Sequence, residues 1–273
     1  MKHFMINMEK KLYYLEEGKE NKEAIIFIHS NLLSNWIWKK QEFNDYHCIY
    51  LDLIDHGKSQ INMPFSIENC VELVKNIITN DLKDKKVHLV GIAIGGTIII
   101  DLLYKHQNIV ETAIISGVNI KNKFIIRDDK RIEELLNSVK ECKINILDKK
   151  PSNFIIHGFL AEYGIGKKYF NQLKQSINTN NFIKITEKYL KYRIPNENNN
   201  FSNLLILYGT KEYPKVIKSA KIIQNHFPKS KVFSVKRAIH LWNIIDYKWF
   251  NETIIEFIKS KNLKNKDYIK QAM

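Results

Sequence analysis

One short segment of this chain has the spacing of a catalytic turn but lacks the atom that would react. Gly91-Ile92-Ala93-Ile94-Gly95 follows an apolar run and precedes a helix-like stretch. Glycines two residues either side of a central residue are typical of a nucleophile elbow, a tight strand-to-helix turn that presents a serine hydroxyl. The glycines are needed because side chains at those positions would clash with the strained turn. Here Ala93 has a methyl group where the hydroxyl would be. The segment therefore predicts an acyl-transfer site without its nucleophile.

The surrounding sequence predicts an alternation of strands and helices that would position this turn. Short apolar runs without polar alternation favour strands that are covered on both faces, as in a parallel sheet. The predicted strands are 24–28, 47–51, 87–90, 112–116, 204–208 and 231–235, with a possible edge strand at 11–15. The predicted helices are 66–81, 94–105, 214–226 and 247–259. The fold class is α/β, with a mostly parallel central sheet and helices on both of its faces.

The alternation breaks in the middle of the chain. Between about residues 120 and 199 the apolar spacing is helical, and no strong strand pattern is present. We expect an inserted helical lid there, and a core formed by residues 1–119 and 200–273.

Five segments, in order, resemble the loops of the alpha/beta-hydrolase superfamily. Four of them accompany the elbow: His29-Ser30-Asn31 after a strand, Asp52-Leu53-Ile54-Asp55-His56-Gly57-Lys58-Ser59, Gly209-Thr210-Lys211-Glu212, and Ala238-Ile239-His240. The elbow, the acid and the histidine follow one another in the order that this fold requires. The resemblance covers nearly the whole chain. Within the superfamily, the chain resembles lidded esterases and C–C bond hydrolases. Three residues depart from the pattern: Ala93 replaces serine, and Ser30 and Ile239 replace glycines.

The resemblance implies a role for each matching position. His240 would be the general base, and Glu212 would orient its imidazole, with Asp246 as a less favoured acid. The backbone N–H groups of Asn31 and Ile94 would form the oxyanion hole. Asp52 and His56 would tie the loop beneath the site. No cysteine thiol and no serine or threonine hydroxyl falls in a loop where it could replace the missing nucleophile. Five aromatic residues could line an apolar pocket or simply pack in the core: Trp36, Trp38, Phe159, Tyr163 and Trp242.

The alanine leaves three interpretations open. The chain could be a serine hydrolase for esters or related acyl compounds whose serine has been replaced, and then it would be inactive or nearly so. It could be a natural binding protein for a small ligand that has lost catalysis. It could also use His240 and Glu212 as a general-base pair without a nucleophile.

Composition limits the classes of partner and compartment. The net charge of +14 could indicate an anionic partner, but the lysines are scattered and no nucleic-acid reader motif accompanies them. We therefore expect no nucleic acid and no membrane, but a small apolar or acyl molecule. The three cysteines share no metal-ligand or disulfide spacing, so we expect no metal, no cofactor and a cytoplasmic location. The oligomeric state is not predicted.

Overall fold

The structure, a computed structural model, describes residues 11–120, 160, 165–176 and 179–272. Its centre is one eight-stranded sheet in the order β1-β3-β2-β4-β5-β6-β7-β8. The two outermost strands are antiparallel to their neighbours, and the six between them are parallel. The strands are β1 (Tyr14–Glu17), β2 (Glu23–Ile28), β3 (His47–Leu51), β4 (Lys86–Ile92), β5 (Thr112–Ser116), β6 (Leu204–Gly209), β7 (Lys231–Val235) and β8 (Ile269–Gln271).

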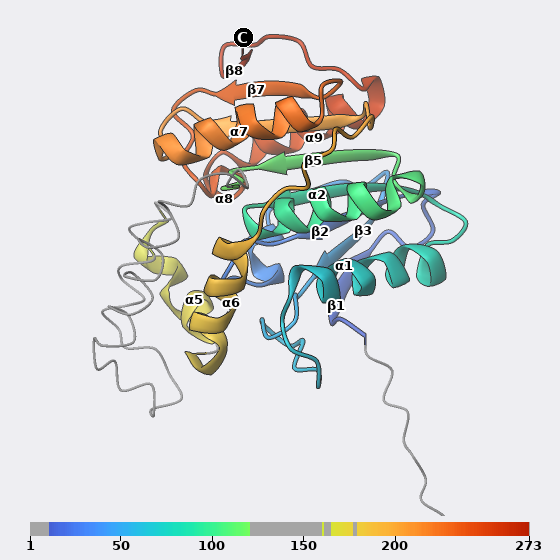
Figure 1. Cartoon of the computed structure of the whole chain (residues 1–273), viewed down its shortest axis with the longest axis vertical. Coiled ribbons are helices and arrows are strands. Elements are labelled where there is room, and N and C mark those ends of the chain that lie inside the picture. The colour runs from blue at the N-terminus through green and yellow to red at the C-terminus, as the bar shows by residue number, and fades with distance from the viewer. Residues whose placement is uncertain (1–10, 121–159, 161–164, 177–178, 273) are drawn as a thin grey trace, which may run out of the picture.

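Helices flank this sheet, as Figure 1 shows. The helices described are α1 (Ile67–Asn76), α2 (Ile94–His106), α5 (Phe170–Ser176), α6 (Thr179–Lys191), α7 (Pro214–His226), α8 (Trp242–Ile245) and α9 (Tyr247–Ser260). Short turns add the 3₁₀ segments η1 (Asn35–Trp38), η3 (Gln107–Ile109) and η4 (Lys167–Tyr169), and the π-helical turn η2 (Ile77–Asp81).

Each face of the sheet has its own apolar core. On one face α1, α2 and α7 pack against alternate strand residues such as Ile26. On the other face η1, α8 and α9 pack against the intervening residues, of which Phe27 is an example. The strands are buried on both sides because successive side chains of a strand point to opposite faces. This explains why the predicted strands are apolar throughout.

Local signals in the sequence explain where several helices begin. The Ser66 side chain accepts a hydrogen bond from the backbone N–H of Asn69 at 3.0 Å, which caps α1. Pro214 occupies the first turn of α7, where its missing N–H costs nothing. The predicted bounds of α7 and of β3, β5 and β7 match the structure.

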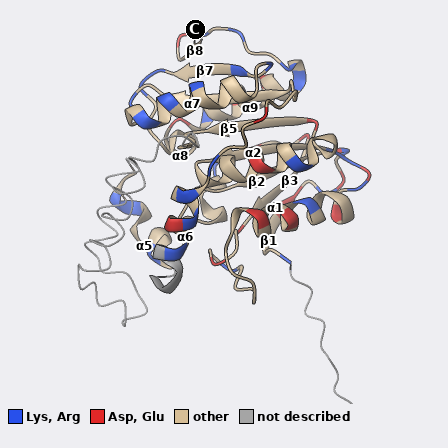
Figure 2. Ribbon diagram, in the orientation of Figure 1, with Lys and Arg blue, Asp and Glu red and all other residues tan. Residues whose placement is uncertain are grey.

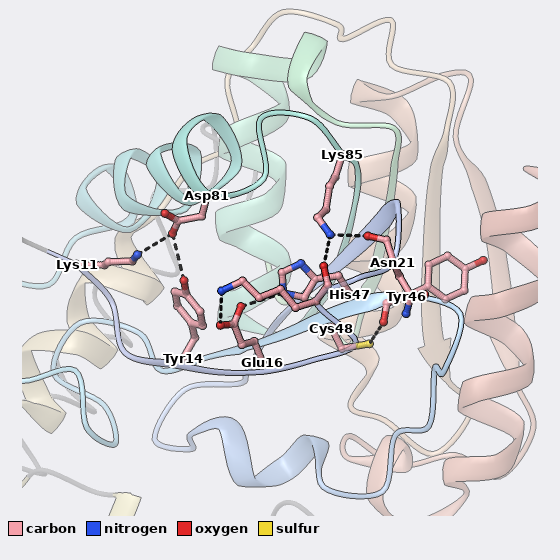
Figure 3. Close-up of polar contacts among 10 residues, drawn as sticks. Lys11, Tyr14, Glu16, Asn21, Tyr46, His47, Cys48, Asp81 and Lys85 are labelled. Carbon is pink, nitrogen blue, oxygen red and sulfur yellow. Dashed lines mark hydrogen bonds and ion pairs between the residues drawn. The ribbon is translucent and has the colours of Figure 1, made fainter.

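The edges of the sheet differ from the prediction. The edge strand β1 begins at Tyr14 and not at Lys11, and β8 was not predicted. Contacts at the β1 edge set this register (Figure 3). Glu16 of β1 accepts a hydrogen bond from His47 of β3 at 2.9 Å, and Lys11 forms a 2.8 Å ion pair with Asp81 at the end of η2. Lys85 donates to the backbone carbonyls of Lys19 and Asn21, which fastens the turn between β1 and β2.

The described helices between β5 and β6 belong to the segment that the sequence analysis expects to be a lid. In Figure 1, α5 and α6 lie next to each other at the lower left, outside the helices that cover the two faces of the sheet. The rest of that segment, 121–159 and 161–164, lies outside the described residues. The lid therefore stays a prediction. Among the described residues, no helix is long and apolar enough to cross a membrane.

Candidate active site

The turn at Ala93 has the strained backbone of a nucleophile elbow. Ala93 precedes α2 with φ 50° and ψ −110°, a conformation in which a Cβ atom is unfavourable. Two backbone hydrogen bonds hold it. Its N–H donates to the Ser116 carbonyl at 3.0 Å, and its own carbonyl accepts from the Thr97 N–H at 3.0 Å. The backbone geometry is therefore fixed without help from the side chain.

Close packing explains the glycine that follows the turn. A Cβ atom on Gly95 would lie 2.2 Å from the carbonyl oxygen of Ile28, at the end of β2. No side chain fits there without moving backbone. The first turn of α2 thus lies directly against the loop that follows β2, which carries the predicted oxyanion donor Asn31. The two predicted donors, Asn31 and Ile94, accordingly belong to segments that pack against each other.

Glu212 and His240 meet at the ends of β6 and β7. Glu212 Oε1 lies 2.8 Å from His240 Nδ1, and its Oε2 accepts from the Gly209 N–H at 2.7 Å. The Glu212 side chain is 2% exposed, whereas that of His240 is 20% exposed. A carboxylate on Nδ1 keeps the proton on that nitrogen, so Nε2 carries the lone pair that a general base needs. The backbone bond from the Lys211 N–H to the Ala238 carbonyl, at 3.1 Å, joins the two loops.

A glycine that the sequence analysis did not single out connects this pair with the elbow. Gly117 has φ +64°, and a Cβ atom there would lie 2.8 Å from Glu212 Oε1 and 3.0 Å from His240 Nδ1. Its neighbour Ser116 accepts the Ala93 N–H, so consecutive residues of one strand end face both halves of the site. The only sequence signal was a glycine directly after a predicted strand.

Ser116 also holds the segment that follows the histidine. Its Oγ accepts a hydrogen bond from Trp242 Nε1 at 3.0 Å, and its side chain is buried. The hydroxyl is therefore engaged with the core and is not placed as a substitute nucleophile, which agrees with the sequence analysis.

Two buried histidines bind the oxyanion loop, which we define as residues 29–35, to the loop after β3. His29 accepts from the Leu53 N–H at 3.0 Å, and His56 accepts from the Leu32 N–H at 3.2 Å. The other ring nitrogen of each lies within 2.8 Å of a backbone carbonyl, so each ring is neutral with its proton on Nδ1. The rings lie 5.0 Å apart.

Burial makes these histidines hard to protonate. It lowers the pKa of His29 from 6.5 to about 4, against a small opposing effect of its bond to the Ser30 carbonyl. Burial, with the neighbouring His29, lowers the pKa of His56 to about 3. Asp52 adds a third tie, because its carboxylate accepts from the Asn35 N–H at 2.7 Å and the Lys58 N–H at 2.9 Å. Asp52 and His56 thus have the structural contacts that the sequence analysis expected.

Helix α6 and the residue that follows it make polar contacts with the oxyanion loop, with the segment after β5 and with α2. Asn31 Nδ2 donates to Thr186 Oγ1 at 3.3 Å, and Tyr189 accepts from the backbone N–H of Asn119 at 3.4 Å. One turn further on, Tyr192 donates to Asp101 of α2 at 3.3 Å. Thr186 and Tyr189 lie three positions apart in α6 and so share one helix face, and Tyr192 follows directly after the helix.

The aromatic pocket candidates divide into two groups. Trp36 stacks on Tyr169 of η4, with ring centroids 5.6 Å apart, and so lies at the junction with the predicted lid. Trp38 and Trp242 are fully buried and pack on Phe250 of α9, at 6.0 and 4.9 Å. Their contacts are those of core residues, which is the second of the two alternatives in the sequence analysis. Phe159 and Tyr163 lie outside the described residues.

The described part of the chain contains no group of three or more His, Cys, Asp or Glu side chains arranged to hold a metal ion. Cys48 and Cys70 are buried thiols, and burial raises the pKa of each to about 12. Neither is therefore a ready thiolate nucleophile.

Comparison with known proteins shows the fold. Residues 23–136 match the family described as alpha/beta hydrolase fold. A curated relative, an AB hydrolase superfamily protein of Gibberella zeae, is 30% identical over 122 residues, which cover 43% of this chain and 43% of the relative. The match thus spans less than half of that relative's length.

Solved structures agree over a larger share of the chain. An esterase from Exiguobacterium antarcticum has a TM-score of 0.73 at 17% identity and covers 91% of this chain and 96% of its own. A thermophilic esterase from Thermogutta terrifontis has a TM-score of 0.71 at 14% identity, covering 92% of this chain and 94% of its own. The predicted α/β-hydrolase fold, with its mostly parallel sheet between helices, is confirmed.

Proposed function

We propose that this chain, which has the alpha/beta hydrolase fold, binds a small ester or related acyl compound at the carboxyl ends of β4–β7. We further propose that it turns over such compounds very weakly or not at all. One observation carries the proposal. Ala93 keeps the elbow conformation, φ 50° and ψ −110°, while Glu212 and His240 contact each other at the ends of β6 and β7. The arrangement is that of a serine hydrolase lacking one oxygen atom.

The roles follow from the geometry and from the resemblance. The N–H groups of Asn31 and Ile94 would receive the carbonyl oxygen of the bound compound, each donor being worth about 3 kcal/mol in a working enzyme. His240 would accept a proton through Nε2, and Glu212 would stabilise the imidazolium that forms. Without a side-chain nucleophile at residue 93, the bound carbonyl has no attacking group apart from water. The esterases of similar fold support an acyl compound as the ligand.

The test is ester hydrolysis by the chain beside its Ala93→Ser variant. p-Nitrophenyl esters from acetate to octanoate would be used as substrates, and a fluorophosphonate probe would report a reactive serine. We expect little turnover by the chain itself and a gain of about a thousandfold or more in the variant, since removing a nucleophile costs orders of magnitude. Labelling of the variant should require His240, so Ala93→Ser combined with His240→Ala is the control.

The His240–Glu212 pair favours a second candidate function, general-base chemistry on a bound molecule. Glu212 is buried, and its carboxylate accepts hydrogen bonds from His240 Nδ1 and from the Gly209 N–H. The pair could therefore act as a base without a nucleophile. A silent and unlabelled Ala93→Ser variant would remove the hydrolase proposal and leave ligand binding or this base chemistry. Robust ester turnover by the chain as it stands would contradict the proposed inactivity.

A further inference from the structure

One stretch of the chain that begins beside the site is basic and has almost no acidic residues. Residues 213–245 contain no Asp or Glu, although the whole chain has 29 among 273 residues. The acid just before this stretch, Glu212, is buried against His240 and is not available to surface lysines. Figure 2 shows lysines, but no acidic residue, on α7, whereas acidic residues lie on α1.

The exposed Lys211, just before this stretch, and five of the exposed cations within it define what we call the basic face: Lys211, Lys215, Lys218, Lys221, Lys236 and Arg237. Two hydrogen bonds bring their loops together: the Lys211 N–H donates to the Ala238 carbonyl at 3.1 Å, and the Arg237 N–H donates to the side-chain Oγ1 of Thr210 at 2.8 Å. The three α7 lysines recur every third residue, which places them along one exposed side of the helix. The basic face thus runs from the loops that carry Glu212 and His240 onto α7.

The cations of the basic face have no carboxylate partner among the described residues, a property they share with other lysines such as Lys22 and Lys83; what sets this part of the chain apart is the absence of Asp and Glu from residues 213–245. Among the described residues, none of the six forms an ion pair. Every lysine–carboxylate pair that the described part of the chain contains lies elsewhere, on Lys11, Lys19, Lys75, Lys86, Lys105, Lys191, Lys259, Lys261 and Lys266. A general excess of lysine would not by itself leave a stretch of 33 residues without any acid. Clustered like charges repel one another, and a partner of opposite charge removes that repulsion.

We infer that the basic face is a docking surface for an acidic protein, which would bind beside the loops that carry Glu212 and His240. The chemistry of the face favours a protein over the other polyanions. Binding to a lipid surface uses an apolar helix face, and the apolar side of α7, including Val216, Ala220 and Ile223, is buried against the sheet. Single-stranded nucleic acid is held by stacked aromatic residues, and Tyr213 is the one large exposed aromatic side chain in the 211–237 stretch. Lysines spaced along a helix suit the carboxylates of an acidic helix or loop.

The test measures binding of a defined acidic polypeptide, fluorescein-labelled poly-L-glutamate, by anisotropy at low and at high salt. The first variant replaces Lys215, Lys218 and Lys221 by Gln. The matched control replaces three exposed lysines that have partners, Lys19, Lys86 and Lys259, by Gln, so that both variants lose the same charge. We expect the first variant to bind about tenfold more weakly and the control to bind as the unchanged chain does, with all binding weakened by salt.

Two further probes separate the kinds of partner. Vesicles of phosphatidylcholine with phosphatidylserine and an oligothymidylate are measured with the same proteins. Equal weakening in both lysine variants would overturn the inference, because the effect would then be one of net charge. Tighter binding to vesicles or to the oligonucleotide, lost in the first variant only, would also overturn it and would assign the face to lipid or nucleic acid. The result does not depend on residue 93, so the proposed function can fail while this inference stands.

Discussion

The two halves of the site are held in place by different kinds of contact. The elbow, residues 91–96, keeps its shape through backbone hydrogen bonds and the close approach of Gly95 to Ile28, none of which uses the side chain of residue 93. The acid–histidine pair, Glu212 and His240, exists only through its side chains. Loss of a nucleophile therefore leaves the elbow intact. Replacing either Glu212 or His240 would remove the contact between them. The presence of this pair is therefore stronger evidence for function than the shape of the elbow.

The largest expected effect comes from breaking the pair in an enzyme whose nucleophile has been restored. In the Ala93→Ser background, Glu212→Gln should lower kcat/KM for p-nitrophenyl acetate by about 10³- to 10⁴-fold, because the amide no longer fixes the tautomer or stabilises the imidazolium. The measurement is steady-state hydrolysis.

Asp246→Asn in the same background provides the matched control. Asp246 also follows the histidine segment, but its described contacts are backbone bonds to Trp242 and Phe250. We expect its rate to stay within a few-fold of the Ala93→Ser variant. A large loss with Asp246→Asn and a small one with Glu212→Gln would reassign the acid.

The second effect concerns acid and the two buried histidines that join the oxyanion loop to the loop after β3. Both His29 and His56 have folded-state pKa values far below 6.5, so between pH 7 and pH 5 the unfolded chain takes up protons that the folded chain does not. Stability is therefore full above about pH 6.5 and falls as the pH decreases. We expect a loss of about 2 kcal/mol for each histidine between pH 7 and pH 5.

Urea unfolding at the two pH values measures this loss. Glutamates whose pKa is lowered by ion pairs, such as Glu72 and Glu111, lose their contribution only below about pH 4.5, outside this window. A His56→Gln variant should show a smaller pH dependence, whatever its stability at pH 7. An unchanged free energy of unfolding at pH 5 would show that the rings are protonated in the folded state or are not buried.

The smallest effect tests whether the backbone alone holds the elbow. Ala93→Gly removes the Cβ atom from a positive-φ position, and Ala113→Gly removes one from β5, where the backbone is extended. Both lose a buried methyl group and gain chain entropy when unfolded, but only the first relieves strain. Its change in unfolding free energy should be more favourable than that of Ala113→Gly by about 1 kcal/mol or more. Equal values would mean that Ala93 is not strained.

Much of the fold was predictable because its signals are local. Apolar runs such as 112–116 and 231–235 mark buried strands, and the proline at 214 marks a helix start, so those bounds match. The predictions fail where pairing with distant residues decides. The strand β8 is short, with two polar residues among its three, and it forms because it pairs with the edge of β7. The register of β1 depends on contacts such as that from Glu16 to His47.

By itself, the sequence determined the order of the site segments and the missing hydroxyl at residue 93, since a motif and its spacing are properties of the chain. Only the tertiary structure decided that Gly117 faces the acid–histidine pair and that Ser116 joins Ala93 to Trp242. It also decided that His29 and His56 are neutral and connect two loops. It also placed Trp38 and Trp242 in the core. Each of these depends on how the ends of distant segments pack together, as when Ser116 and Trp242 meet although they lie 126 positions apart.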